Sequence, residues 1–186
     1  MQMNLKYISM EEKYLLPAAK LVEEVFTDHE NEKEGKLVRS LVEEIRRLDS
    51  YIPSLELIAV DENDNVVGYV MMSGFHLNGN YKDKLLILTP AAVKTQLQRR
   101  HISKNLIELG FEKAIQMGYE AVIVEGNPLN YRARGFVTAF DHGILPGKTV
   151  HLPAIECLMV KELKEGALEN IRGTVEYYDY KVLLDE

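Results

Sequence analysis

Apolar and polar residues follow two different periods along this chain. Leu5 to Ile8 alternate between the two kinds and predict an opening strand. Apolar residues then recur at helical spacing and predict two helices, one from Ser9 to about Phe26 and one from about Leu37 to Leu48. The polar run TDHENEKEG between them predicts a loop, and Glu12 follows Ser9 at the spacing of a capping box.

From Leu55 onward the pattern is that of strands. LELIAV and VVGYVMMSGF are joined by the turn residues ENDN and predict a hairpin, and a second turn, HLNGNYKD, leads into LLILTPAAV. Three consecutive strands with such turns predict an antiparallel meander. The last strand runs through a polar turn into a predicted helix from Ser103 to about Met117, which Gly118 is placed to cap.

Another strand follows this helix directly. AVIVEG predicts a buried strand, and a strand, a helix and a strand in succession imply a right-handed crossover with locally parallel pairing. NPLNYRARGF predicts a loop with a short helical turn, HLPAIECLMVKEL a late strand with Cys157 in the core, and LKEGALENI a short terminal helix. Without a repeat or an obvious linker, the pattern predicts one mixed α/β domain over residues 1–186.

Composition and charge narrow the class of protein. The hydrophobic fraction of 46% and the charged fraction of 27% are ordinary for a globular domain. The net charge of −7 argues against nucleic acid as the main partner, because phosphate contacts need a broad basic face. The lone cysteine excludes an internal disulfide framework, and no signal peptide or apolar run of roughly 18 residues is present. We therefore expect a soluble, cytoplasmic protein that binds neither nucleic acid nor a membrane.

The segment from Leu85 to Phe111 contains the most informative chemistry. An apolar run breaks at a polar turn, and a basic cluster precedes the apolar residues of the helix. The cluster consists of Lys94, Arg99, Arg100, His101 and Lys104. A strand, a basic turn and a helix start can hold phosphate, since the N–H groups of the first turn lack intrahelical partners and the macrodipole is positive there. A solvated helix start with a few cationic side chains explains the same residues equally well.

The order of elements and the stretch TPAAVKTQLQRRHISKNLIELGFEKAIQMGYEAVIVEGNPLNYRARGF resemble the acetyl-CoA-binding core of the GNAT superfamily of N-acetyltransferases. The tail, LPAIECLMVKEL and then EGALENIRGTVEYYDY, is similar to the YhbS-like branch of that superfamily. The close resemblance covers roughly Leu85 to Tyr178, with the coenzyme-binding core at about residues 85–136 and a C-terminal strand and tail at 150–186. It implies a central mixed, mostly antiparallel sheet of about six to seven strands with helices on both faces.

The resemblance also implies a set of coenzyme-binding residues, with acetyl-CoA as the acetyl donor and no metal. The backbone of Ala91, Ala92 and Val93 would pair with the pantetheine arm, and one N–H near Val93 would polarise the thioester carbonyl. The residues around the pyrophosphate would be Gln98, Arg99, Arg100, His101, Ile102, Ser103 and Lys104. Asn127 would bond the pantetheine, although a turn-forming Asn before Pro128 accounts for it equally well.

Two residues depart from the family's pattern. With Gln98 at the first motif position, His101 and Ser103 stand where the superfamily usually has glycines, which let the backbone approach the pyrophosphate. Ser103 can cap the helix or donate to a phosphate, and His101 either donates to the pyrophosphate when protonated or obstructs the turn. Two hypotheses follow: an N-acetyltransferase in which a primary amine attacks the thioester directly, or a GNAT-like binding or regulatory protein without turnover.

Tyr131 is the residue that the resemblance assigns to catalysis. It falls where the family has a tyrosine near the coenzyme sulfur, and a phenol can donate a proton to a departing thiolate. A buried tyrosine that anchors the loop is the alternative. The general base stays open among Glu125, His76 and Glu156.

The sequence leaves the acceptor open as a small-molecule or peptide amine. The first helices and their loop offer only acids, which would favour a cationic amine or would form a solvated face. These acids are Glu23, Glu24, Asp28, Glu30, Glu32 and Glu34. A homodimer is compatible with the fold. The histidines and the cysteine show no metal-ligand spacing, and neither a Gly-x-Gly-x-x-Gly nor a Walker motif is present.

Overall fold

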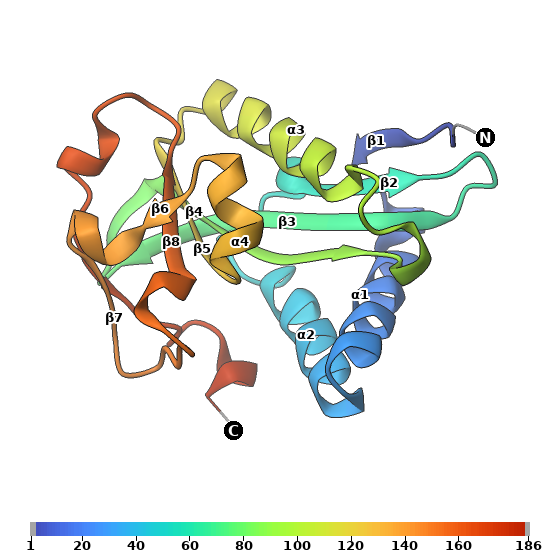
Figure 1. The fold of residues 1–186 in the computed structure, drawn as a ribbon, viewed down its shortest axis with the longest axis horizontal. Coiled ribbons are helices and arrows are strands. Elements are labelled where there is room, and N and C mark those ends of the chain that lie inside the picture. Colours follow the sequence, from blue (N-terminus) through green and yellow to red (C-terminus); the bar gives the residue numbers. More distant parts are fainter. Residues whose placement is uncertain (1–2, 185–186) are drawn as a thin grey trace. The chain divides into compact units, whose positions relative to one another are not determined.

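The computed structural model describes residues 3–184, whose strands form a seven-stranded and a two-stranded sheet (Figure 1). The strands are β1 (Lys6–Ser9), β2 (Glu56–Val60), β3 (Val66–Leu77), β4 (Asn80–Val93), β5 (Ala121–Glu125), β6 (Val137–Thr138), β7 (Ile144–Pro146), β8 (Leu158–Glu162) and β9 (Gly173–Val175). The α-helices are α1 (Leu15–His29), α2 (Glu32–Ile45), α3 (Ile102–Gln116) and α4 (Pro128–Tyr131). In the order β1-β2-β3-β4-β5-β8-β6, β4 and β5 pair in parallel, whereas β1–β2, β2–β3, β5–β8 and β6–β8 pair antiparallel. The predicted mixed α/β fold with a mostly antiparallel sheet is confirmed.

The chain divides into two compact units. The first comprises the residues up to Met72 together with Pro90–Lys113, and it contains β1, β2, α1, α2 and most of α3. In it α1 and α2 lie side by side (Figure 1). The buried residues of this helix pair are Ala18, Ala19, Leu21, Val22, Val25, Gly35, Val38, Leu41, Val42 and Ile45. Their spacing of three and four residues forms one apolar stripe on each helix, which is why the helical period is visible in the sequence.

The second unit comprises Ser73–Thr89 and the chain from Ala114 onward. Here the parallel ladder joins Leu85–Leu88 of β4 to Ala121–Val124 of β5, and β5 also pairs antiparallel with β8. All the side chains of this ladder are buried, which explains the uninterrupted apolar runs LLIL and AVIV. The parallel pairing expected of the strand–helix–strand crossover is confirmed.

The turn between α1 and α2 is much shorter than predicted. α1 continues to His29 and α2 begins at Glu32, so most of the run TDHENEKEG is helical. Asn31 is the N-cap of α2, and its side chain accepts a hydrogen bond from the N–H of Glu34 at 3.0 Å. The predicted loop is wrong because acidic residues that follow an Asn cap favour the positive end of a helix.

The predicted helix start at Ser9 is also wrong. Ser9 is the last residue of β1, and its hydroxyl donates to the carbonyl of Ser54 at 2.9 Å. A 3₁₀ turn over Glu12–Tyr14 precedes α1, whose N-cap residue Tyr14 makes no side-chain capping bond. The spacing of a capping box is present here, but the serine hydroxyl is used to attach the end of a strand.

β3 and β4 are longer than predicted, because the turn between them consists of Asn78 and Gly79. Both residues have positive φ, 52° and 85°, as a type I′ hairpin turn requires. β3 therefore reaches Leu77, and β4 begins at Asn80. The Asn-Gly pair inside HLNGNYKD is a strong hairpin signal, and the longer predicted turn overlooked it.

The C-terminal elements are shorter than predicted. Within HLPAIECLMVKEL only Leu158–Glu162 forms a strand, since Pro153 cannot donate to a ladder. Cys157 ends a 3₁₀ turn and is partly exposed, so its predicted place in the core is wrong. Within LKEGALENI only Ala167–Glu169 is helical, as a 3₁₀ turn that follows Gly166 in the left-handed conformation.

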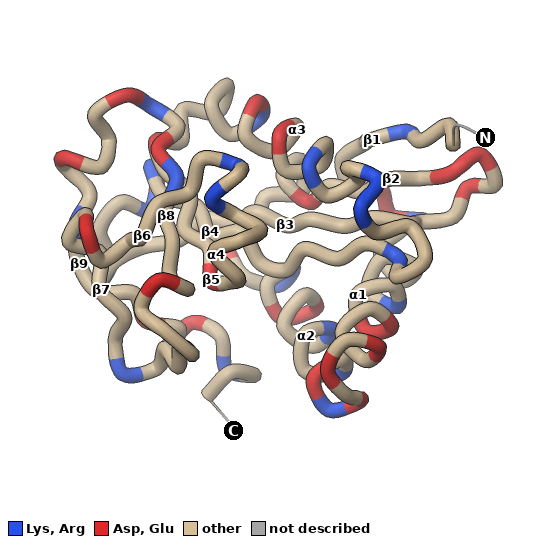
Figure 2. Tube along the Cα trace, viewed as in Figure 1, with Lys and Arg blue, Asp and Glu red and all other residues tan. Residues whose placement is uncertain are grey.

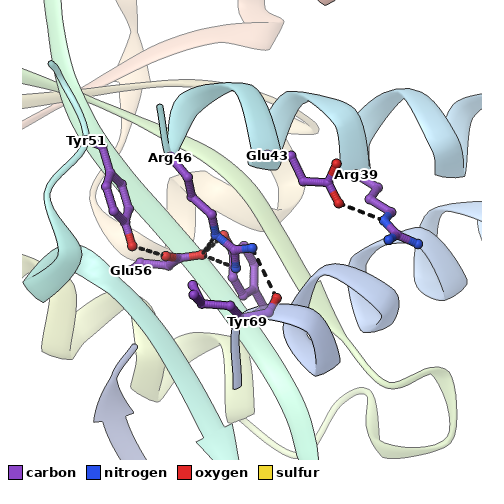
Figure 3. A network of polar contacts seen from close by, with 7 residues as sticks. Arg39, Glu43, Arg46, Tyr51, Glu56 and Tyr69 are labelled. Carbon is purple, nitrogen blue, oxygen red and sulfur yellow. Dashed lines mark hydrogen bonds and ion pairs between the residues drawn. The ribbon is translucent and has the colours of Figure 1, made fainter. Parts of the chain in front are cut away.

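A buried polar network lies inside the first unit (Figure 3). Glu56, at the start of β2, is fully buried, and one of its carboxylate oxygens accepts from Nε and Nη2 of Arg46 at 2.9 and 2.6 Å. Tyr69 donates to the same oxygen at 2.6 Å, and Tyr51 donates to the other oxygen. A charge removed from water needs such partners. The network was not predicted, although a glutamate inside the apolar run LELIAV is a signal for it.

Candidate active site

The loop between β4 and α3 is anchored inside the first unit. The side-chain amide of Gln98 donates to the carbonyl of Val93 at 3.3 Å and lies 2.7 Å from Nε2 of His29. The hydroxyl of Thr95 donates to the Asp28 carboxylate at 2.8 Å. The contacts of Gln98 with His29 and of Thr95 with Asp28 tie the loop to the C-terminal end of α1. The loop backbone is therefore held in place, although many of its residues are exposed.

The loop backbone is left-handed at two residues, Arg99 and His101, with φ of 62° and 63°. Positive φ is the conformation for which glycine is the default residue, and histidine tolerates it better than most side chains do. The resemblance predicts a glycine at the position of His101, and the backbone here has the conformation that a glycine would supply. Histidine in place of glycine changes the surface of the turn, because it adds an exposed imidazole side chain.

α3 begins at Ile102 and is packed tightly against β3. A Cβ at Gly68 would lie 2.6 Å from Cγ2 of Ile102, so the close approach of the helix start to the strand requires glycine there. The N–H of Asn105 donates to the carbonyl of His101 at 3.0 Å and begins the helical ladder. The N–H groups before this bond point out of the end of α3, where the macrodipole is positive.

Positive charge gathers around this helix start (Figure 2). Arg99 and Arg100 are exposed, and within residues 3–184 neither has an ion-pair partner. Lys104 lies 3.8 Å from Glu108 one helical turn later, with both side chains more than half exposed, so this pair holds the lysine only weakly. The turn therefore offers main-chain donors and uncompensated guanidinium groups, which suits an anionic ligand such as a diphosphate.

Asn127 is the N-cap of α4 in the second unit. Its side-chain oxygen accepts a hydrogen bond from the N–H of Leu129 at 2.9 Å, and Pro128 occupies the first helical position. The predicted turn-forming role of Asn127 is therefore confirmed. Its role toward pantetheine stays a prediction.

Tyr131, the last residue of α4, lies with its ring over the end of β5. A Cβ at Gly126 would lie 2.6 Å from Cε2 of Tyr131, and the ring of Phe136 meets the tyrosine edge-on at 5.5 Å between centroids. Within residues 3–184 its hydroxyl makes no hydrogen bond. Burial raises the pKa of the Tyr131 phenol, and the charge of Arg134 acts in the opposite direction. The phenol therefore keeps its proton at neutral pH and is available to a ligand.

Glu125 ends β5 and accepts a hydrogen bond from the hydroxyl of Tyr177 at 2.7 Å. The residue as a whole is exposed, yet partial burial of the carboxylate raises its pKa. The hydrogen bond from Tyr177 and the charge of His151 lower the pKa and offset part of that effect. Glu125 is thus a carboxylate with an elevated pKa beside the tyrosine-bearing turn.

The two other candidate bases are differently placed. Nε2 of His76 lies 2.7 Å from the Asp179 carboxylate, and its Nδ1 accepts from the N–H of Gly79 at 2.9 Å, so both ring nitrogens are engaged. Glu156 is exposed on the 3₁₀ turn before β8. Of the three candidates, Glu125 alone lies next to Gly126, over which the ring of Tyr131 rests.

Several acids of α1 and α2 have partners within the protein, among them Glu23, Asp28 and Glu32. Glu23 lies 2.7 Å from Arg39, and Glu32 lies 2.5 Å from Lys36. Asp28 accepts a hydrogen bond from the Thr95 hydroxyl. These pairs account for part of the acidic segment without an acceptor amine.

Two features of other protein classes do not occur within residues 3–184. His, Cys, Asp and Glu side chains form no group of three that could hold a metal ion. The helices of the same residues are too short or too polar to cross a bilayer.

The predicted site residues fall into two sets, one in each unit. Ala91–Val93 and Gln98–Lys104 belong to the first unit, where the Gln98 contact to Val93 joins them. Asn127 and Tyr131 belong to the second unit, on the same short helix. Two glycines that place these residues were not predicted, Gly68 beneath the start of α3 and Gly126 beneath Tyr131. A glycine in a strand pattern is the signal that could have found them.

Comparison with known sequences gives one family and a small group of relatives. The sequence model of the acetyltransferase (GNAT) family matches residues 19–141 of the chain. The chain is 29% identical over 153 residues to YhbS of Escherichia coli strain K12, an N-acetyltransferase described as uncharacterized, and the match covers 81% of this chain and 84% of that protein.

Solved structures confirm the fold. YhbS from Escherichia coli in complex with CoA has a TM-score of 0.81 at 24% identity, covering 97% of this chain and 93% of that one. A GNAT family acetyltransferase from Brucella melitensis in complex with acetyl-CoA has a TM-score of 0.69 at 19% identity, covering 94% of this chain and 96% of that one. The family match runs through residues of both units, since it begins in α1 and ends after β6.

Proposed function

This chain belongs to the acetyltransferase (GNAT) family, and on that premise we propose that it moves an acetyl group from acetyl-CoA to a primary amine by direct attack on the thioester. The observation that carries the proposal is the backbone at the start of α3, which is left-handed at His101, where the family motif has a glycine. We take the two units together as one acetyltransferase domain, because the family match includes residues of both.

The first unit supplies the coenzyme contacts in this proposal. The backbone of Ala91–Val93 pairs with the pantetheine arm, and the turn from Gln98 to Lys104 surrounds the pyrophosphate, chiefly through main-chain N–H groups. Two relatives with this fold contain CoA or acetyl-CoA, which supports the same ligand here. The uncompensated charges of Arg99 and Arg100 support it further, because they oppose the net charge of the chain.

The second unit supplies the proton for the leaving group. In the reaction, the amine nitrogen forms a bond to the carbonyl carbon, the carbon–sulfur bond breaks, and the sulfur leaves as a thiolate. Tyr131 donates its phenolic proton to that thiolate, and Asn127 bonds the pantetheine near it. An N–H near Val93 stabilises the oxyanion of the tetrahedral intermediate. Tyr131 suits the role because its hydroxyl is protonated at neutral pH and makes no hydrogen bond within residues 3–184.

Acetyl transfer by the purified protein to a panel of amines tests this proposal, with Tyr131→Phe as the paired variant. The phenylalanine keeps the ring against Gly126 and Phe136, so we expect unchanged affinity for acetyl-CoA and a kcat lower by about a hundredfold, as for loss of a general acid. Transfer to no amine of a broad panel by a protein that binds acetyl-CoA would contradict the proposal.

The alternative is a GNAT-like binding or regulatory protein without turnover, because His101 and Ser103 replace glycines. The variant His101→Gly separates the two. Since His101 already adopts the conformation that a glycine would supply, we expect the Kd for acetyl-CoA to change by less than about tenfold, or 1.4 kcal/mol. An affinity that rises by more than this would mean that the imidazole obstructs the turn, and would favour the alternative.

A further inference from the structure

We propose that Glu125 is the general base that accepts the proton of the attacking amine, and that Tyr177 is the residue that positions its carboxylate. The assignment rests on the proposed acetyl transfer. It names the residue that completes the proton transfers of that reaction and gives a role to the C-terminal segment of the chain, which lies beyond the family match.

The position of Tyr177 is fixed by hydrogen bonds of its neighbours and backbone and by packing of its ring. β9 pairs in parallel with β7, and the carboxylate of Glu176 accepts from the N–H groups of Lys148 and Thr149, each at 3.0 Å. The N–H of Tyr177 itself donates to Oγ1 of Thr149 at 2.7 Å. Its buried ring packs against Phe75 and Tyr180, with centroids 6.4 and 6.0 Å away. The direction of the hydroxyl toward Glu125 is therefore set by the fold.

Glu125 and Tyr131 reach the end of β5 from opposite faces. Successive side chains of an extended strand point to opposite sides, and the N–H of Gly126 continues the ladder by donating to the carbonyl of Cys157 at 2.9 Å. The ring of Tyr131 covers the side of Gly126, whereas the carboxylate of Glu125 lies on the other side with Tyr177. An acid for the leaving thiolate and a base for the entering amine need this arrangement, since bond formation and bond breaking occur on different sides of the carbonyl carbon.

Glu125 also has the capacity to accept a proton. Within residues 3–184 it has no ion-pair partner and one hydrogen-bond donor, Tyr177, so lone pairs of the carboxylate remain for an amine. The groups that face it are Tyr177 and, at longer range, His151. Partial burial raises the pKa of Glu125 above its ordinary value, which makes the carboxylate a stronger base than an exposed one.

The proton balance of the reaction closes with these two residues. Glu125 takes one proton from the amine nitrogen as the carbon–nitrogen bond forms, and Tyr131 gives one proton to the thiolate. After the amide leaves, the carboxyl of Glu125 releases its proton to water, and Tyr131 is reprotonated from water. No oxidant, reductant or metal ion takes part.

The test compares Glu125→Gln with Glu165→Gln, a matched change at an exposed glutamate outside the site. The probes are 1,4-diaminobutane, which is protonated at neutral pH, and hydroxylamine, which is mostly neutral. We expect Glu125→Gln to lower kcat/KM for the diamine by about a hundredfold, and for hydroxylamine by less than about tenfold, because less proton removal is then needed. Glu165→Gln should leave both values unchanged.

The variant Tyr177→Phe tests the positioning role through the pH profile. Removal of a donor to the ionised form raises the pKa of Glu125, so the acidic limb of kcat/KM should move to higher pH. A merely structural role would lower the rate without moving that limb. Full activity of Glu125→Gln toward the diamine would overturn the assignment while acetyl transfer stands. Failure of the wild-type protein to acetylate these probes and every amine of the broad panel would overturn the proposed function, and this assignment with it.

Discussion

Two glutamates in this molecule each accept a hydrogen bond from a tyrosine, yet their surroundings differ in every other respect. Glu56, at the start of β2, is fully buried and receives hydrogen bonds from Arg46, Tyr51 and Tyr69 (Figure 3). Glu125, at the end of β5, is an exposed residue and receives one hydrogen bond, from Tyr177. The first carboxylate belongs to the interior of the first unit, and the second to the candidate active site of the second unit.

Burial of a charge is therefore a poor sign of function by itself. The carboxylate of Glu56 is not available for a ligand, because both of its oxygens accept hydrogen bonds and the Arg46 guanidinium stabilises the anion. Glu125 keeps lone pairs without a protein partner and has an elevated pKa, so it can take up and release a proton. A fully satisfied carboxylate stabilises the fold, whereas a partly satisfied one at a strand end can do chemistry.

The largest effect should come from removing the cation beside Glu56. We expect Arg46→Met to lower the free energy of unfolding by about 3–5 kcal/mol, since a buried carboxylate loses its ion pair. Arg39→Met, in which the lost ion pairs with Glu23 and Glu43 are partly exposed, should cost less than about 1 kcal/mol. Urea unfolding of both variants measures the difference. Equal losses would mean that the buried network contributes no more than a surface pair.

A larger residue at Gly126 should lower the rate of acetyl transfer without changing the affinity for the coenzyme. In Gly126→Ala the new Cβ lies 2.6 Å from Cε2 of the ring, which must move. A displaced catalytic group lowers kcat by about a hundredfold, while the Kd for acetyl-CoA stays unchanged. In the background of Tyr131→Phe the same alanine should add little, because both changes act on one group. Additive losses would mean that Gly126 acts independently of the tyrosine.

Removal of the Tyr51 hydroxyl should lower stability more than removal of the Tyr177 hydroxyl. Tyr51→Phe takes a donor from a buried charge and should lower the free energy of unfolding by about 1.5–3 kcal/mol. Tyr177→Phe should cost about 1 kcal/mol or less, because Glu125 is an exposed residue that water can reach. Thermal unfolding of the pair checks this order. A reversed order would contradict the view that Tyr177 serves the reaction rather than stability.

The smallest effect is the pH dependence of stability. Because the folded pKa of Glu125 lies above its ordinary value of 4.5, the folded state binds more protons than the unfolded state between these two values. The contribution to stability is present below pH 4.5 and is lost as the pH rises through the folded pKa. Glu125→Gln removes this loss, so the variant should gain stability relative to the wild type from pH 4 to pH 7. A constant difference over that range would mean that the pKa is not elevated.

Local patterns predicted most of the fold. The strands β2 and β5 and the helix α3 were predicted within about one residue of their observed bounds, because their apolar runs are buried. The C-terminal end of β3 and the N-terminal part of β4 were predicted less completely. The errors lie where a local signal has two meanings. An acidic run after Asn31 resembles a loop as well as a helix start, and Ser9 sits at a cap-like spacing while its hydroxyl binds Ser54 across 45 residues of chain.

The candidate site could be predicted only where its residues are close in sequence. The turn from Gln98 to Lys104 and the segment from Asn127 to Tyr131 are contiguous motifs. The hydrogen bond between Glu125 and Tyr177 joins residues 52 positions apart, and sequence alone does not reveal which tyrosine meets the strand end. Left-handed backbone at Arg99 and His101 was equally hidden, because neither residue type requires it.

Isothermal titration of the purified protein with acetyl-CoA, with dephospho-CoA alongside, tests the central claim most directly. We expect one site per chain with a Kd in the micromolar range, in spite of the replaced glycines. A weaker value for dephospho-CoA would assign the 3′-phosphate to the basic turn. No detectable binding of acetyl-CoA at millimolar concentration would contradict the account, because neither Tyr131 nor Glu125 would then have a thioester to act on.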